Sequence, residues 1–240
     1  MRLIGVGVGP GDPEHLTLKA LTALRDADRV FVPETDTSGN GPGRAERIVA
    51  PHVAPERIAR LAFAMRDDEA RAGNWDRAGA AIAEVVGAGG TAAFATIGDP
   101  NLYSTFSYVA ETVRDLVPGL VVETIPGITA LQDLASRSGT VLAEGDERLA
   151  LVPWPAGEAP LREALDGYDT VVVYKGGRHL PRVLDAIRDA GRLEAAVYGE
   201  QLGLDDEDVR AAADREGFGP YMSTVIVPRR APHGRGERLR

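Results

Sequence analysis

Short runs of apolar and β-branched residues alternate with helix-like patterns along most of this chain. The runs that predict β-strands are Leu3–Val8, Arg29–Val32, Ile58–Phe63, Thr91–Ile97, Leu120–Ile125, Leu149–Val152, Thr170–Tyr174, Ala195–Tyr198 and Ser223–Val227. Apolar positions at helical spacing predict helices over Pro13–Asp26, Arg44–Val49, Asp76–Val86, Tyr103–Val117, Thr129–Arg137, Leu161–Leu165, Leu180–Asp189 and Asp206–Asp214. Alternation of this kind is typical of parallel α/β architecture.

Two Pro-Gly pairs near the middle of the chain indicate a division into two α/β lobes. Pro118-Gly119 and Pro126-Gly127 bracket the point at which the strand and helix pattern starts again. We therefore predict an N-terminal lobe over residues 1–119 and a C-terminal lobe over residues 120–228. The end of the chain, residues 229–240, is rich in arginine and contains proline and glycine, so we expect a basic, disordered tail.

Composition narrows the class of protein. The 240 residues carry a net charge of −9, which argues against nonspecific binding of nucleic acid. The absence of cysteine excludes disulfides, thiolate catalysis and Cys-based metal sites. No apolar stretch approaches the roughly 20 residues that span a bilayer, and Met1–Gly11 contains no signal-cleavage site. We therefore expect a soluble cytoplasmic protein that does not bind membranes.

Three glycine-bearing loops follow predicted strands. Gly5–Pro13 ends the first strand, Gly98-Asp99-Pro100 ends the fourth, and Pro126-Gly127-Ile128-Thr129-Ala130 ends the fifth. Each would be an ordinary turn by itself. In α/β folds, however, small molecules bind at the carboxyl edge of the sheet, where such loops meet. The three loops are therefore the first candidates for a binding site.

The sequence excludes the common nucleotide and metal motifs. The pattern G-x-G-x-x-G fails at Pro10 when it starts at Gly5, and at Asp12 when it starts at Gly7. The chain has no Gly-Lys pair for a Walker A loop, and its four histidines lack metal-ligand spacing. We therefore predict no metal site. A nucleoside with an amino-acid end and no phosphate fits these loops better, and the sulfonium of S-adenosylmethionine tolerates a carboxylate such as Asp99.

The three loops, in this order, closely resemble those of the tetrapyrrole (corrin/porphyrin) methylase family. The resemblance covers almost the whole chain. It implies a two-lobed α/β fold, the class III S-adenosylmethionine methyltransferase fold, with the active-site cleft between the lobes. Further segments look like the precorrin-2 C-20 methyltransferase branch: Gly9–Ala20, Phe31-Val32-Pro33, Tyr103–Tyr108, Glu144-Gly145-Asp146-Glu147 and Tyr221-Met222-Ser223-Thr224. One departure is Tyr198-Gly199-Glu200-Gln201, where the branch suggests Tyr-Val-Glu-Arg.

The resemblance implies methyl transfer from S-adenosylmethionine to carbon 20 of precorrin-2 or cobalt-precorrin-2 in cobalamin biosynthesis. S-adenosylhomocysteine would be the product. The alternatives are a precorrin methyltransferase acting at another ring carbon and a non-catalytic carrier that binds a tetrapyrrole. The same segments disfavour a diphthine synthase type. A homodimer is expected by resemblance.

The resemblance also assigns site residues. Contacts to the methyl donor are expected from Pro10, Gly98, Asp99, Leu102, Ser104, Thr105, Thr129, Ala130, Tyr174, Lys175, Leu202, Ser223 and Thr224. A proton must leave the methylated carbon, and the candidate bases are Asp99, Tyr103 and Glu144. The substrate carries many carboxylates although the protein is acidic, so we hypothesise a local arginine lining drawn from Arg44, Arg47, Arg66, Arg71 and Arg178.

Overall fold

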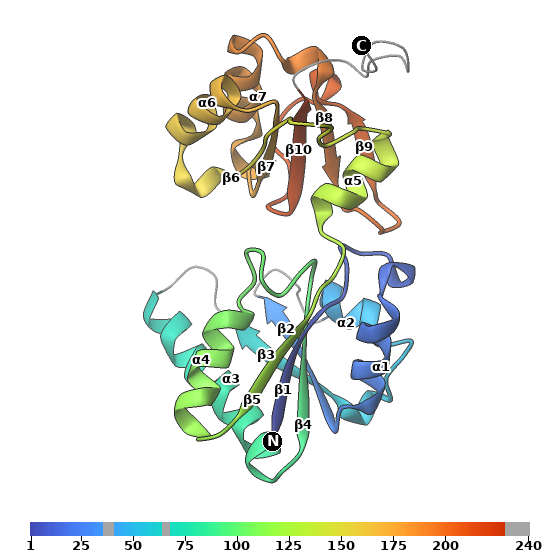
Figure 1. Ribbon diagram of the computed structural model, residues 1–240, viewed down its shortest axis with the longest axis vertical. Helices are drawn as coiled ribbons and strands as arrows, with labels where there is room; N and C mark the ends of the chain where they lie inside the picture. Colours follow the sequence, from blue (N-terminus) through green and yellow to red (C-terminus); the bar gives the residue numbers. More distant parts are fainter. Residues whose placement is uncertain (36–40, 64–67, 229–240) are drawn as a thin grey trace. The chain divides into compact units, whose positions relative to one another are not determined.

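The computed structural model describes residues 1–35, 41–63 and 68–228, so the predicted basic tail lies outside the described residues. The chain divides into a first unit, Met1–Thr129, and a second unit, Ala130–Arg240 (Figure 1). The division therefore follows Thr129 rather than residue 119. The reason is the strand at Val121–Ile125, which pairs with the first strand of the chain and so completes the sheet of the first unit.

A five-stranded parallel sheet forms the centre of the first unit. Its strand order is β3-β2-β4-β1-β5, and every neighbouring pair is parallel, as the alternating pattern predicts. The strands are β1 (Arg2–Gly7), β2 (Arg29–Thr35), β3 (Ile58–Phe63), β4 (Thr91–Thr96) and β5 (Val121–Ile125). In this order β1 lies between β4 and β5, so the loops that follow these three strands emerge side by side.

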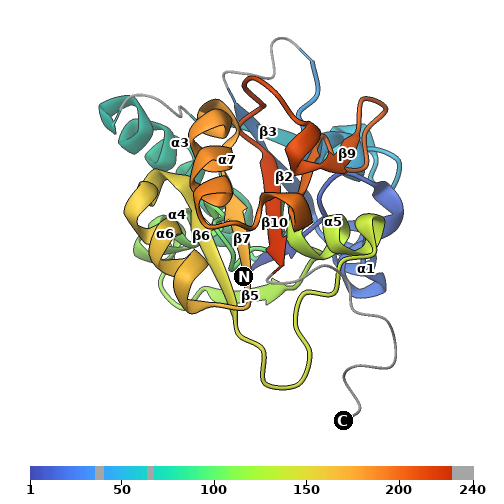
Figure 2. The same ribbon diagram turned by 90° about the horizontal axis from the view of Figure 1, so that it is seen from above.

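Helices cover both faces of this sheet (Figures 1 and 2). They are α1 (Leu18–Asp26), α2 (Arg44–Val49), α3 (Asp68–Gly87) and α4 (Phe106–Leu116), with short 3-10 turns at Pro13–His15 and Pro55–Arg57. Because side chains alternate along a strand, Ile4 and Val6 of β1 pack with α1 and α2. Leu3 packs on the other side with α3 and α4.

Two predicted helices of the first unit begin later than the sequence suggests. The predicted helix Pro13–Asp26 is a 3-10 turn followed by α1, because two side chains each cap their own segment. Asp12 Oδ1 accepts from the amide of Glu14 at 2.8 Å, and Thr17 Oγ1 accepts from the amide of Ala20 at 3.1 Å. The helix predicted from Tyr103 begins at Phe106, since Tyr103 has a φ of 53°, which a right-handed helix excludes.

The second unit contains a mixed sheet of order β6-β7-β10-β8-β9. Only β6 and β7 are parallel neighbours, so the parallel architecture that the alternating pattern favours holds for the first sheet and not for most of this one. The strands are β6 (Leu149–Pro153), β7 (Thr170–Tyr174), β8 (Val197–Glu200), β9 (Asp208–Ala211) and β10 (Ser223–Pro228). The predicted helix Asp206–Asp214 is also wrong, because Asp208–Ala211 pairs with β8 as a strand and Ala212–Asp214 forms a 3-10 turn.

Three α-helices pack on the two faces of the second sheet (Figure 2). They are α5 (Ala130–Ser138), α6 (Glu158–Gly167) and α7 (Leu180–Asp189), with 3-10 turns at Trp154–Ala156, Gly177–His179 and Leu193–Ala195. Val171 and Val173 of β7 pack with α6 and α7, whereas Val172 packs with Leu134 of α5. Within the described ranges, no helix combines the length and the apolar character that a membrane crossing requires.

Candidate functional site

Three glycines join the three sequence motifs into one structure, the glycine junction, formed by Gly7, Gly98 and Gly127. A Cβ at Gly7 would lie 2.5 Å from the amide nitrogen of Gly127 and 2.6 Å from the carbonyl oxygen of Gly98. A Cβ at Gly127 would lie 2.1 Å from the same carbonyl oxygen. Because no side chain fits at these distances, the loops after β1, β4 and β5 pack directly through their backbones.

Asp99 holds two of these loops with its carboxylate. Its Oδ2 accepts from the amide of Gly127 at 3.1 Å, and its Oδ1 accepts from the amide of Asn101 at 2.8 Å. Hydrogen bonds from backbone amides to a carboxylate are among the stronger ones in proteins. The geometry therefore gives Asp99 a positioning role in the loop after β4, while its role as a base stays a prediction.

Two glycines of these loops adopt positive φ angles. Gly98 has a φ of +69°, and the nearest heavy atom to a Cβ built there is the Cα of Thr129, at 3.9 Å. Gly9 also adopts a positive φ, +82°, and Pro10 beside it is buried. Backbone groups without side chains allow close approach of a ligand. The structure thus brings together Gly98 and Thr129, two predicted contacts to the methyl donor.

The segment between this loop and α4 contains four predicted site residues, Leu102, Tyr103, Ser104 and Thr105. Thr105 is the N-cap of α4, and Ser104 before it holds the helix start: its Oγ lies 2.9 Å from Thr96 Oγ1 and accepts from the amide of Phe106 at 3.1 Å. Tyr103 has a left-handed backbone and is 43% exposed. Partial burial raises the pKa of Tyr103 above its usual value of 10, so its phenol keeps its proton at neutral pH.

In the second unit, several predicted contacts to the methyl donor also lie together. The hydroxyl of Tyr174, at the end of β7, accepts from the amide of Leu131 at 2.8 Å and so holds the first turn of α5, which begins at Ala130. Thr224 of β10 is in register with Tyr174 on one side and with Gly199 on the other. Ser223 and Thr224 are both buried, each 3% exposed.

Gly199 brings Leu202 into the same group of residues. A Cβ at Gly199 would lie 2.6 Å from Leu134 Cδ1 and 3.2 Å from Leu202 Cδ2, so the missing side chain makes room for both leucines. Gln201, which stands where the branch suggests arginine, has a φ of 54°, and its Nε2 donates to Asp206 Oδ2 at 3.0 Å. The departure from the expected motif therefore places a side-chain amide, paired within its own loop, at this position.

Two other predicted residues of the second unit differ in their surroundings. Lys175, directly after β7, has a φ of 61°, a conformation that costs a residue with a side chain about 1–3 kcal/mol and is enriched at functional sites. Glu144 is exposed in the loop before β6, and its amide donates to Glu147 Oε2 at 3.0 Å. Its role as a base stays a prediction.

A partly buried polar network that the sequence analysis missed connects β8 with the segment between β9 and β10. Tyr198 is fully buried, and its hydroxyl donates to Glu200 Oε2. Arg215 lies 3.4 Å from the same carboxylate and 5.3 Å from the centroid of the Tyr198 ring. Burial, followed by the hydrogen bond to Glu200, raises the pKa of Tyr198 far above 10. The strand alternation of Tyr198 and Glu200, which puts both on one face, was the available signal.

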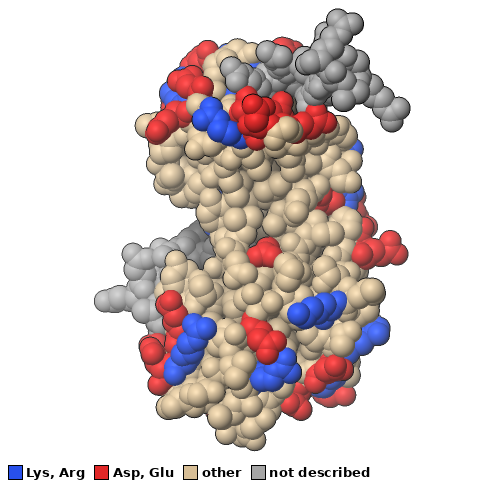
Figure 3. All heavy atoms as spheres, in the orientation of Figure 1, with Lys and Arg blue, Asp and Glu red and all other residues tan. Residues whose placement is uncertain are grey.

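The arginine lining that we hypothesise stays a prediction. Arg44 and Arg47 both lie in α2. Arg47 Nε donates to the carbonyl oxygen of Pro42, just before this helix, at 3.2 Å. Arg66 and the side chain of Arg71 lie outside the described residues. Arg178 is exposed in the 3-10 turn after β7. On the face drawn in Figure 3, acidic and basic side chains of the described residues are interspersed on each unit.

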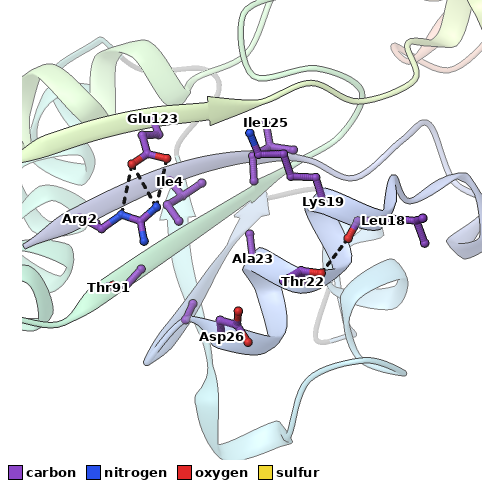
Figure 4. Close-up of a pocket in the computed structure, with 11 residues that line it drawn as sticks. Arg2, Ile4, Leu18, Lys19, Thr22, Ala23, Asp26, Thr91, Glu123 and Ile125 are labelled. Carbon is purple, nitrogen blue, oxygen red and sulfur yellow. Dashed lines mark hydrogen bonds and ion pairs between the residues drawn. The ribbon is translucent and has the colours of Figure 1, made fainter.

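A groove of about 400 Å³ lies beside α1 and the edge strand β5 (Figure 4). Arg2 and Glu123 pair across β1 and β5 at 3.0 Å in its wall, and Lys19 reaches over Ile125. None of the residues that the sequence assigns to a site lines this groove. Among the described residues, no group of three or more His, Cys, Asp and Glu side chains is arranged to hold a metal ion.

Comparison with known proteins decides the family. The model of the tetrapyrrole (corrin/porphyrin) methylases matches residues 2–214. The chain belongs to this family. As a tetrapyrrole methylase, it is 35% identical over 235 residues to the precorrin-2 C(20)-methyltransferase of a Sinorhizobium species, with 95% of each chain covered. It is 32% identical to the probable cobalt-precorrin-2 C(20)-methyltransferase of Methanocaldococcus jannaschii, over 95% of this chain and 96% of that protein.

Solved structures agree with the fold of this tetrapyrrole methylase. The uroporphyrin-III C-methyl transferase of Thermus thermophilus, complexed with S-adenosylhomocysteine, superposes with a TM-score of 0.68 at 22% identity, over 95% of this chain and 97% of that one. The predicted two-lobed methylase fold is thereby confirmed. The placement of a cofactor in a cleft between the lobes stays a prediction.

Proposed function

We propose that this tetrapyrrole methylase transfers a methyl group from S-adenosylmethionine to carbon 20 of precorrin-2 or cobalt-precorrin-2. The observation that carries the proposal is the glycine junction, in which three motifs distant in sequence meet in one backbone surface. The similarity to two C-20 methyltransferases over nearly their full length supports the choice of ring carbon. The reaction belongs to cobalamin biosynthesis.

The first unit offers backbone surface to the methyl donor. Gly98 and Thr129 lie side by side, and Pro10 is the buried residue beside Gly9. Asp99 holds the loop through the amides of Asn101 and Gly127. A ligand with a nucleoside and an amino-acid end can use such loops, because their peptide groups provide both hydrogen-bond donors and acceptors.

The second unit supplies buried strand ends. Tyr174 holds the start of α5, and Thr224 lies opposite it on β10, so both positions are fixed by backbone pairing. Lys175 adds a cation in a strained backbone conformation. Rigid elements of this kind keep contact groups in place without further ordering when the ligand binds.

The bound donor supplies an electrophilic methyl group on a sulfonium. The reduced tetrapyrrole is an electron-rich nucleophile, so the protein needs no covalent intermediate of its own. Its main task is to hold the two reactants in line, which is worth up to about 7–11 kcal/mol of the barrier. Burial raises the pKa of Tyr103, which favours the protonated phenol as a hydrogen-bond donor, and its role as a base stays a prediction.

The test is incubation of the purified protein with S-adenosylmethionine and with precorrin-2, metal-free and cobalt-loaded in parallel. Mass spectrometry and carbon NMR then identify the product. One added methyl at carbon 20 supports the proposal, and the preferred macrocycle decides whether cobalt is present in the substrate. A methyl at another ring carbon would instead assign the protein to a different branch of the tetrapyrrole methylase family. Binding without methyl transfer favours the carrier. The homodimer and the cytoplasmic location stay predictions.

A further inference from the structure

Two cations of the second unit lie against one aromatic ring. Lys175 Nζ and Arg178 Cζ are each 5.8 Å from the centroid of the Tyr221 ring. Contact with the face of a ring attracts each cation, but two positive charges beside one ring repel each other. An anion placed next to them removes that repulsion. We call Lys175 and Arg178, together with the ring that they share, the Tyr221 cation pair.

The backbone beneath the Tyr221 cation pair is tightly packed. A Cβ at Gly177 would lie 1.9 Å from the carbonyl oxygen of Pro220 and 2.6 Å from Ser223 Oγ. The amide of Gly219 donates to the carbonyl oxygen of Gly177 at 2.7 Å. The turn that bears Arg178 and the loop that bears Tyr221 are therefore fixed against each other, so a ligand meets cations whose backbones are already in place.

The charge around Arg178 differs from that around its neighbours. Arg182 and Arg188 both lie in α7. Arg182 pairs with Glu158 at 3.0 Å, and Arg188 pairs with Asp185. Within the part of the chain that the structure describes, no carboxylate forms an ion pair with Arg178. In a protein of net charge −9, an arginine held on a ring beside a lysine has the donors to bind a carboxylate from a ligand.

We propose that Lys175, Arg178 and Tyr221 form a binding site for a carboxylate of the reactants, an inference that rests on the proposed function. Two reactants carry this group. A tetrapyrrole of the proposed class has acetate and propionate side chains, and the methyl donor has the α-carboxylate of its methionine part. Lys175 is itself a predicted donor contact, and it directly follows Tyr174, which pairs with Thr224 on β10. The experiment separates the two sources.

The experiment measures binding rather than turnover. Arg178→Gln is compared with Arg182→Gln, which removes the same charge from a neighbouring exposed position whose arginine already has a carboxylate partner. Calorimetry or fluorescence titration follows three ligands: S-adenosylhomocysteine, 5′-methylthioadenosine, which lacks the carboxylate, and sirohydrochlorin, a stable tetrapyrrole with carboxylate side chains. Melting temperatures confirm that the variants fold.

We expect Arg178→Gln to weaken binding of one carboxylate ligand about tenfold, the effect of losing one charge-assisted hydrogen bond. Loss with sirohydrochlorin assigns the site to the tetrapyrrole, and loss with S-adenosylhomocysteine assigns it to the donor. Methylthioadenosine should bind equally to both variants. Tyr221→Leu should weaken the same ligand, whereas Tyr221→Phe, which keeps the ring, should not.

The outcomes separate this site from the proposed function. Equal affinities of Arg178→Gln and Arg182→Gln for all three ligands overturn the site, and so does an equal loss for methylthioadenosine. A wild-type protein that binds neither carboxylate ligand overturns it too. A wild-type protein that shows the Arg178 effect but adds no methyl at carbon 20 refutes the proposed function and leaves the carboxylate site intact.

Discussion

The amide nitrogen of Gly127 donates to Oδ2 of Asp99 over 3.1 Å, so the loop after β5 is held by a carboxylate from the loop after β4. The other oxygen of Asp99 accepts from the amide of Asn101. Both carboxylate oxygens therefore accept hydrogen bonds that hold the loops in this conformation. The sequence alone leaves open whether Asp99 acts as a base or as a positioning group, and these two hydrogen bonds support the positioning role.

Replacement of Asp99 distinguishes these roles. Asp99→Ala leaves two backbone amides without their acceptor, so we expect it to lower the free energy of unfolding by about 1–3 kcal/mol and to weaken binding of S-adenosylhomocysteine. Asp99→Asn retains one oxygen acceptor and should cost less. Urea unfolding and calorimetry measure both effects. Abolished turnover with unchanged stability and unchanged affinity would instead identify Asp99 as the base.

A side chain at Gly127 should disrupt the glycine junction. Gly127→Ala places a Cβ 2.1 Å from the carbonyl oxygen of Gly98, so the loops must move apart. We expect the free energy of unfolding to fall by about 1–3 kcal/mol and ligand binding to weaken. Gly87→Ala is the matched control, because a Cβ there meets no heavy atom within 4 Å. A variant as stable as this control would contradict the close packing.

The Tyr174 hydroxyl should matter for the start of α5. Tyr174→Phe removes the acceptor for the amide of Leu131 and should lower stability by about 0.5–1.5 kcal/mol. If the first turn of α5 contacts the methyl donor, the KM for S-adenosylmethionine rises as well. Tyr168→Phe is the control, since Tyr168 is 40% exposed and its ring contact with Arg148 survives the change. Equal KM values in the two variants would argue against a donor contact at this turn.

Tyr198 should make the protein sensitive to alkaline pH. Its folded-state pKa is raised well above the usual value of 10, chiefly by burial and then by the Glu200 carboxylate. The folded protein therefore keeps a proton that the unfolded chain releases, and stability falls as the pH rises above about 10. Urea unfolding from about pH 8 to 11 measures this decline. Tyr198→Phe should be less stable at neutral pH and show a flatter decline, whereas parallel curves would assign the alkaline loss to other groups.

The sequence predicts the first unit better than the second, for a physical reason. Each strand of the first sheet is followed by a helix or by a loop and helix, so local periodicity is enough to predict parallel strands. In the second sheet β8 is antiparallel to both β9 and β10, and the four residues Asp208–Ala211 become a strand only through pairing with β8. The unit boundary was likewise set by a long-range contact, the pairing of β5 with β1.

The candidate site likewise combines features that local sequence motifs predict with features that depend on contacts between distant parts of the chain. The three glycine loops are visible as motifs, and their position after strands predicts that they meet at one edge. The clustering of Tyr174 with Thr224 depends on the antiparallel register of β7 and β10, which no local pattern specifies. The sharing of Glu200 by Tyr198 and Arg215 joins residues of separate elements, and the sequence offers only the strand alternation as a signal.

The glycine junction also limits how this protein can be engineered. Gly7 and Gly127 each exclude a side chain, because the backbones of the other and of Gly98 occupy its space. A chimera that takes a single loop from a relative would therefore set a foreign backbone path against two native ones. Exchange of substrate preference between family members by loop grafting should succeed only when all three loops are moved together.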